Sequence, residues 1–176
     1  MKSLSSLGIS DALLHAATIY HHEARKCVKG KAYLAAVVMQ VAALEATLQS
    51  MCAIYTDDVK KTMVYRAKKF RRKRNRALEF TMKQLIDIAA ELGWFPPKRF
   101  TWAGKRSDVA GFTHEIRDFR NYVHPGRLAR DRTPPGFSKG AYEVVYEVCD
   151  VANSWLLHRV EQGLLRAMER EKKRKR

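Results

Sequence analysis

One stretch near the N-terminus limits the possible folds more than any other. Between residues 31 and 55 apolar side chains return at i, i+3, i+4 and i+7, the period of an α-helix with one buried face. The stripe consists of Tyr33, Leu34, Val37, Val38, Val41, Leu44, Leu48, Met51, Cys52 and Tyr55. Its most apolar part, residues 32–48, also holds Gln40 and Glu45, which makes it too short and too polar for a membrane span. The pattern therefore predicts the core helix of a soluble protein.

Apolar residues at helical spacing predict four further helices, over residues 10–27, 76–92, 108–124 and 138–169. Ser10 is a suitable N-cap for the first of them, and Ser107 or Asp108 is a suitable N-cap for the third. Gly93, followed by prolines at positions 96 and 97, ends the helix over 76–92. The positions expected to be buried in the second and the last of these helices are Leu78, Met82, Leu85, Ile86, Ala89, Leu92, Tyr142, Val145, Cys149, Ala152, Leu156, Val160 and Leu164.

The link over residues 94–107 is expected to be a long loop, because no stretch of the chain shows the period-two alternation of a strand. It combines aromatic side chains with cations. The aromatic rings either stack on nucleic-acid bases or, as the preferred interpretation, hold the loop against the domain. The sequence thus predicts one all-α domain over 1–170, a bundle of about five helices. It carries a basic insertion at 59–76 and ends in a frayed basic tail at 171–176.

The charge of the chain restricts its partners. The formal net charge is +16 and the sequence pI is about 10.0, which favours an anionic partner, with nucleic acid first and a membrane surface or a ribosomal contact after it. Ten lysines and arginines fall between residues 60 and 76, with no acidic residue among them. This segment is either a phosphate-binding arm or a solvated, self-repelling segment.

The cysteines and histidines give no metal-binding pattern. Cys27, Cys52 and Cys149 are odd in number and none stand at metal-ligand spacing. They are expected to be buried, reduced thiols of a cytoplasmic protein, and the N-terminal residues lack a signal-peptide core. His21 and His22 are expected to be a solvated pair, so no metal and no cofactor is predicted.

The helix over 108–124 has two different faces. Its apolar face consists of Phe112, Ile116, Phe119 and Val123, and its polar face consists of Thr113, Arg117, Arg120, Asn121 and His124. Pro125 ends the helix directly after His124. Such a histidine beside arginines could hold a phosphate and move a proton, or it could simply be a cation that the helix dipole favours at a C-terminus. Glu45 of the core helix either pairs with Arg117 or Arg120 or reaches solvent.

The order of these parts resembles the HEPN superfamily. The second helix reads AYLAAVVMQVAALEATL, a later short helix carries RDFRNYVH, and a long helix closes the fold. Members of that superfamily are small helical bundles, and many are metal-independent RNases of toxin, CRISPR or antiviral systems. Their motif is an arginine, commonly followed by a polar residue, with a histidine after four to six residues. Arg117, Asp118 and His124 fit it, whereas Arg120 and Asn121 resemble the RN-x-x-H variant, so either arginine could be the motif residue.

The resemblance implies an endoribonuclease with Arg117, Arg120 and His124 as catalytic residues and Glu45, Asp118 and Asn121 in support. Histidine would serve as general base or acid and arginine would stabilise the phosphate. The implied assembly is a homodimer with the motifs near its two-fold axis. The residues expected to bind RNA are Lys68, Lys69, Arg71, Arg72, Lys73, Arg74, Arg76, Arg127 and Arg130.

Two other functions fit the same sequence. The first is a non-catalytic HEPN-like bundle that binds RNA or a partner protein, such as a nucleotidyltransferase antitoxin. The second is a DNA-associated helical protein, although no recognition-helix pattern supports it. No membrane association is expected. The charge is compatible with all of these functions, so it cannot distinguish them.

Overall fold

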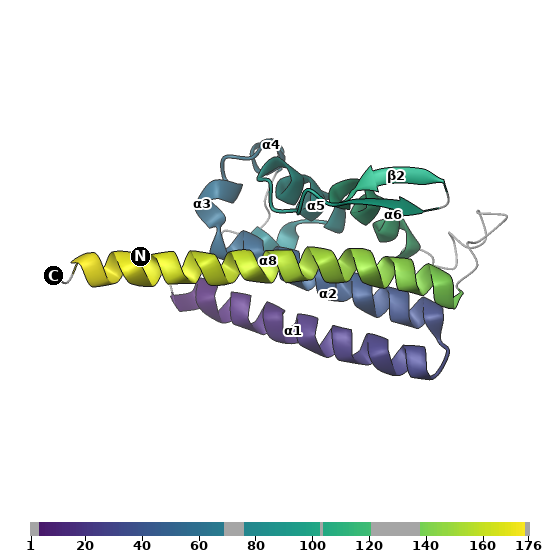
Figure 1. The fold of residues 1–176 in the computed structure, drawn as a ribbon. Helices are drawn as coiled ribbons and strands as arrows, with labels where there is room; N and C mark the ends of the chain where they lie inside the picture. The colour runs from purple at the N-terminus through teal and green to yellow at the C-terminus, as the bar shows by residue number, and fades with distance from the viewer. Residues whose placement is uncertain (1–3, 69–75, 103, 121–137, 175–176) are drawn as a thin grey trace.

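The computed structural model describes residues 4–68, 76–102, 104–120 and 138–174, with side chains described for 8–68, 76–101, 104–118 and 138–162. It is an all-α fold (Figure 1). All five expected helices are present: α1 (Leu4–Lys29), α2 (Tyr33–Ile54), α5 (Met82–Glu91), α6 (Val109–Arg120) and α8 (Lys139–Arg174). Short helices α3 (Thr56–Val59) and α4 (Met63–Ala67) and the 3-10 helix η1 (Arg76–Glu79) join α2 to α5.

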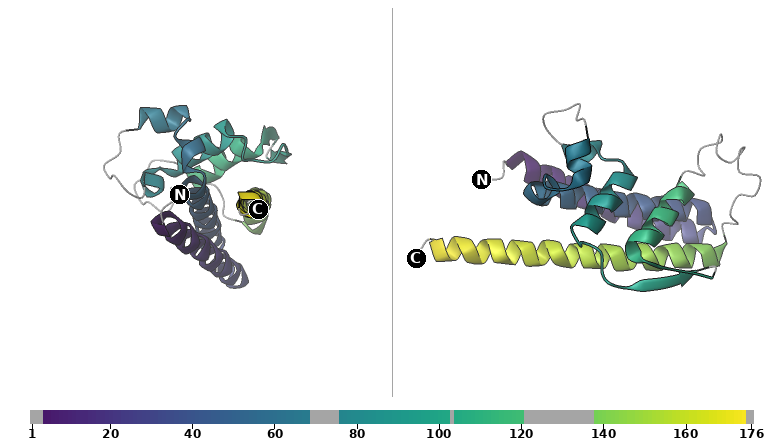
Figure 2. Two further views of the ribbon diagram at one scale, coloured as in Figure 1. Left: turned by 90° about the vertical axis from the view of Figure 1, so that its left-hand side faces the viewer. Right: turned by 90° about the horizontal axis from the view of Figure 1, so that it is seen from above.

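Helix α2 is the centre of the bundle. It contacts α1, α5, α6 and α8, and Figure 2 shows α1 and α8 as separate long rods beside it. Leu44, Leu48 and Met51 have no exposed surface, as the apolar stripe predicts. Burial extends beyond that stripe, because Gln40 and Ser50 are also fully buried. A helix that contacts neighbours on so many sides has little need for a polar face.

The apolar run within this helix was expected to be too short and too polar for a membrane span. The helix that the structure shows is longer than that run. Among the described residues, α2 is long and apolar enough to cross a membrane by those two criteria alone. The helix covers 22 residues rather than the 17 of the apolar run, and 67% of its most apolar window is buried inside the bundle. The core helix of a soluble protein passes the same test.

The N-terminus of α1 differs from the prediction. The helix begins at Leu4, so Ser10 is not its N-cap but lies inside it. Ser10 is buried, and its hydroxyl lies 2.7 Å from that of Ser50 on α2. Burying a serine hydroxyl without a hydrogen-bond partner costs free energy. Here the partner is supplied by a residue 40 positions away.

The segment expected to be one helix over 76–92 is divided. Residues 76–79 form η1, and α5 starts after Thr81, which makes a capping box with Gln84. Leu78 is 40% exposed instead of buried, because it precedes the helix on which the stripe continues. Gly93 has φ +61 and follows the C-cap, as predicted.

The link before α6 contains a β-hairpin, although the sequence pattern predicted no strand. Strand β1 (Arg99–Trp102) pairs with β2 (Lys105–Asp108) in antiparallel register, with Phe100 opposite Ser107. Phe100 and Trp94 are buried, which agrees with the interpretation that the aromatic residues hold this link against the domain. The rings of Phe100 and Phe112 lie 6.1 Å apart at 83°, so the hairpin is fixed to α6 by an edge-to-face contact.

Helix α8 closes the bundle and is longer than expected. Ser138 Oγ accepts a hydrogen bond from the backbone N–H of Ala141, and the helix continues to Arg174, through the tail that was expected to be frayed. The expected stripe is confirmed for its described side chains, which are Tyr142, Val145, Cys149, Ala152, Leu156 and Val160. The hydroxyl of Tyr55 donates a hydrogen bond to the carbonyl of Arg159 at 2.8 Å.

Candidate functional site

Helix α6 is held in a defined orientation by its N-cap and its apolar face. Asp108 Oδ1 accepts a hydrogen bond from the N–H of Gly111 at 2.8 Å, so Asp108 is the cap that the sequence left undecided. Phe112 and Ile116 are fully buried as expected. Thr113 is also fully buried, which contradicts its assignment to the polar face. Its hydroxyl is satisfied locally, since it donates to the carbonyl of Val109 at 2.6 Å.

Arg117 lies at the edge of the buried face of α6. Its side chain is 25% exposed, and its Nη2 lies 3.0 Å from Oδ1 of Asp118. Nε of Arg117 donates to the same oxygen at 3.4 Å. Asp118 therefore orients the guanidinium while leaving part of it accessible. Within the described residues, Nη1 of Arg117 has no hydrogen-bond partner and can reach an anion.

A second polar pair lies beside Arg117 and was not expected from the sequence. His114 Nε2 lies 3.1 Å from Oδ1 of Asp87, which connects α6 to α5. Lys83 Nζ contacts the other oxygen of Asp87 at 2.7 Å. Burial lowers the pKa of His114, and the charges of Arg117 and Lys83 lower it further, against the opposing effect of Asp87. The lowered pKa favours the neutral imidazole, in which Nε2–H donates a hydrogen bond to the carboxylate.

The sequence could have pointed to His114 but not to its partner Asp87. His114 stands three residues before Arg117, a spacing that places both on one side of a helix. Asp87, however, belongs to another helix. Nothing in the sequence indicates that α5 and α6 pack together so that Asp87 lies opposite His114. The structure thus brings Asp87, His114, Arg117 and Asp118 together, with Lys83 at the edge.

The lowered pKa of His114 predicts a pH dependence of stability. Between the folded-state pKa and the unfolded value of about 6.5, the unfolded chain binds more protons, so the free energy of unfolding falls as the pH drops below about 6.5. His114→Gln should weaken this dependence, as measured by urea unfolding at pH 7.5 and 5.5. His22→Gln, at an exposed position of α1, should behave like the wild type. Identical pH profiles for His114→Gln and the wild type would contradict the prediction.

The structure describes only the two ends of the basic insertion, residues 59–68 and residue 76. Lys68 donates to Oε1 of Gln84 at 3.1 Å and lies 5.9 Å from the ring centre of Phe80. Arg76 donates to the hydroxyl of Tyr65 and lies 5.9 Å from the centre of its ring. Both predicted RNA contacts are thus also packing groups that bring the two ends of the segment onto the same side of the domain.

Several predicted site residues lie outside the described residues or side chains. The positions outside are Lys69, Arg71, Arg72, Lys73, Arg74, Asn121, His124, Arg127 and Arg130. The backbone of Arg120 ends α6, but its side chain is not described. Glu45 is half-buried on α2, which contacts α6, and its pairing with an arginine stays a prediction.

The thiols and metal-ligand groups add no second centre among the described residues. Cys52 and Cys149 are buried and free, and burial raises the pKa of Cys52 and raises that of Cys149 to about 12. Such thiols stay protonated and unreactive at neutral pH. Cys27 is only half-buried, unlike the full burial expected. In the part of the chain that the structure describes, no three His, Cys, Asp or Glu side chains are grouped so that they could hold a metal ion.

Comparison with known proteins adds no family to the description of the fold. No protein-family model, no curated protein and no solved structure matches this chain. The chain is an all-α bundle with a small hairpin, and any assignment of its function rests on its residues and their arrangement.

Proposed function

We propose that this chain is a metal-independent endoribonuclease of the HEPN type. The observation that carries the proposal is the placement of Arg117 on α6. Its partly accessible guanidinium is oriented by Asp118, and it precedes His124 by the interval of the family motif. The all-α bundle and the net charge of +16 are compatible with this function.

The proposed reaction uses the 2′-hydroxyl of RNA as its nucleophile. His124 removes the proton of that hydroxyl or donates a proton to the leaving 5′-oxygen. The 2′-oxygen bonds to phosphorus, the bond from phosphorus to the 5′-oxygen breaks, and the products are a 2′,3′-cyclic phosphate and a 5′-hydroxyl. Arg117, with Arg120 as the other candidate, holds the phosphate and stabilises the negative charge that builds up in the transition state.

A homodimer is part of the proposal. A single arginine and histidine provide few catalytic groups, whereas two motifs facing one cleft provide one imidazole for each proton transfer. The polar groups beside Arg117, including His114 and Asp87, would then lie near the shared cleft. An antitoxin protein as a further partner and a cytoplasmic location stay predictions from the sequence.

The test of the proposal is RNA cleavage in the presence of a chelator. Mixed cellular RNA is incubated in EDTA with the wild type, with His124→Ala and with His22→Ala as the exposed control. Cleavage is expected with the wild type and the control, and at most a trace of residual cleavage with His124→Ala. Intact RNA in all three reactions would contradict the nuclease. If RNA is then still bound in a salt-sensitive way, the non-catalytic RNA-binding alternative is supported instead.

The basic insertion is expected to provide much of the RNA affinity. Replacing Arg71, Arg72, Lys73 and Arg74 with glutamine should weaken binding of single-stranded RNA. The slope of log K against log salt should fall by up to about 0.7 for each phosphate contact that the substitutions remove. The measurement is a fluorescence titration at several salt concentrations.

The matched control removes the same number of cations elsewhere. Lys26, Lys98, Lys105 and Lys139 lie outside the insertion, and each contacts an acidic residue within 4.0 Å. Replacing these four with glutamine changes the net charge equally but removes cations that are already paired. If both quadruple variants lose affinity equally, the insertion is not a specific RNA contact.

A further inference from the structure

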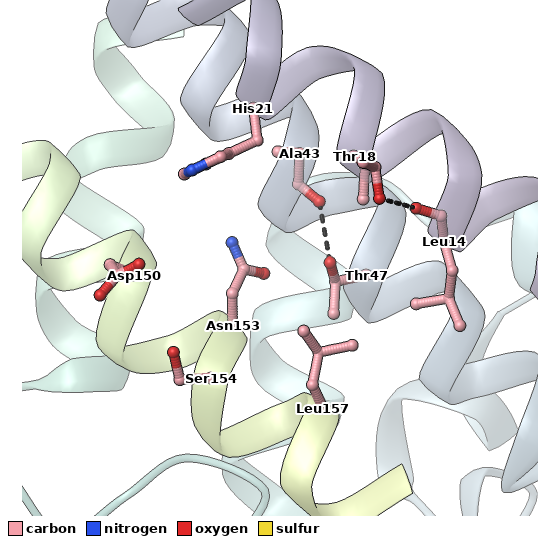
Figure 3. Close-up of a pocket in the computed structure, with 10 residues that line it drawn as sticks. Leu14, Thr18, His21, Ala43, Thr47, Asp150, Asn153, Ser154 and Leu157 are labelled. Carbon is pink, nitrogen blue, oxygen red and sulfur yellow. Dashed lines mark hydrogen bonds between the residues drawn. The ribbon is translucent and has the colours of Figure 1, made fainter. Parts of the chain in front are cut away.

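A cavity lies on the side of the bundle away from the polar groups of α6. It is a cavity of about 280 Å³ between α1, α2 and α8 (Figure 3). Helix α1 contributes Thr18 and His21, α2 contributes Thr47, and α8 contributes Asp150 and Asn153. An apolar cavity of about 150 Å³ accommodates benzene. This one therefore has room for an aromatic ring with a short side arm.

Two threonine hydroxyls of the cavity present acceptors to it. The hydroxyl of Thr18 donates to the carbonyl of Leu14, and the hydroxyl of Thr47 donates to the carbonyl of Ala43. Because each hydroxyl has a single proton, both present only lone pairs to the cavity. Figure 3 shows these two bonds, with Asn153 extending from α8 into the space between His21 and Thr47.

Two further acceptors lack a donor among the described residues. Oδ1 of Asn153 is buried and receives no hydrogen bond from any of them. A buried carbonyl oxygen without a donor typically costs about 1–3 kcal/mol, so it is a group that a ligand donor would satisfy. The carboxylate of Asp150 borders the same cavity, and no lysine or arginine of the described residues lies within 4.0 Å of it.

The charge of the site is thus opposite to that of the molecule. A chain with net charge +16 repels cations in general, yet this cavity combines a carboxylate, which no described cation pairs, with several lone pairs and an apolar wall of Leu14, Ala17 and Leu157. The ligand that fits is a small organic ammonium ion. Its N–H groups would meet the carboxylate of Asp150, and its apolar body would lie against Leu14 and Leu157.

We infer that the cavity between α1, α2 and α8 binds a small primary ammonium ion with an apolar body. This inference does not depend on ribonuclease activity, since no residue of the cavity belongs to the proposed catalytic site. The probes are phenethylamine, protonated at pH 7, and its neutral and anionic counterparts 2-phenylethanol and 3-phenylpropionate. Binding is measured by isothermal titration calorimetry on the full chain.

The structure predicts saturable binding of phenethylamine and at least tenfold weaker binding of the alcohol and the carboxylate. Asp150→Asn keeps the shape of the side chain and should weaken phenethylamine binding at least tenfold. Glu143→Gln, on the same helix and outside the cavity, is the control and should bind like the wild type. Circular dichroism establishes that both variants are folded.

Three results would overturn the inference: no saturable binding of phenethylamine, equal binding of phenethylamine and 2-phenylethanol, or unchanged binding by Asp150→Asn. Ala17→Leu provides an independent check, because it adds bulk at a half-buried position of the cavity wall. Loss of phenethylamine binding in this variant is expected. Binding at wild-type strength would place the ligand elsewhere and would likewise contradict the inference.

Discussion

Replacing Phe112 with alanine is expected to lower the free energy of unfolding by about 3–5 kcal/mol. The Phe112 side chain has no exposed surface, and its ring makes the edge-to-face contact with Phe100 that fixes the hairpin to α6. The substitution creates a cavity where α6 faces the core. It removes a large part of a total stability that is typically about 5–15 kcal/mol.

The measurement is urea unfolding followed by circular dichroism. Leu78→Ala is the control, because Leu78 is 40% exposed and a surface substitution usually changes stability by less than about 0.5 kcal/mol. A similar decrease in both variants would mean that Phe112 is not a core residue. The whole placement of α6, and with it of Arg117, would then be wrong.

The second large effect is expected at the arginines of the motif. If the proposed RNA cleavage occurs, Arg117→Ala should lower kcat about 10²–10³-fold, the usual consequence of removing one group that stabilises transition-state charge. Arg117 is expected to have the larger effect of the two arginines, because it matches the family spacing and is oriented by Asp118. Arg120→Ala should then lower kcat less.

The experiment compares kcat and KM for Arg117→Ala, Arg120→Ala and the exposed control Arg106→Ala, with each variant also combined with His124→Ala. Groups that act as a unit are strongly non-additive. Replacing the motif arginine should therefore lower the activity little further in the His124→Ala background. The opposite ranking, with Arg120→Ala nearly inactive and Arg117→Ala active, would reassign the motif to the RN-x-x-H form.

The elements that could be predicted from sequence are those whose stability comes from long periodic patterns. The stripes of α2 and α8 repeat over many turns, so the amino-acid pattern alone identifies most of their buried residues. Ser10 shows the limit of local signals, since a residue type that suits an N-cap is in fact a buried side chain paired with Ser50. That partner is decided by how α1 packs on α2, which a local pattern does not contain.

The hairpin escaped prediction for a different reason. Each strand has only four residues, and β2 reads KRSD, without an apolar alternation. Only Phe100 gives the hairpin a buried apolar anchor among its described side chains, and a single residue has no period. The His114–Asp87 pair was missed for the same reason as the Ser10–Ser50 contact, because it connects two helices whose packing the sequence does not reveal.

The length of α8 divides this helix into two parts with different origins of stability. At 1.5 Å per residue its 36 residues extend about 54 Å, against about 33 Å for the 22 residues of α2. Figure 1 shows its C-terminal end beyond the start of α1. The N-terminal part, up to the contact of Tyr55 with Arg159, unfolds only with the core. We expect the end that projects past the start of α1 to open at a lower free energy than the domain, because the last turns of a helix are only marginally stable unless another element packs on them.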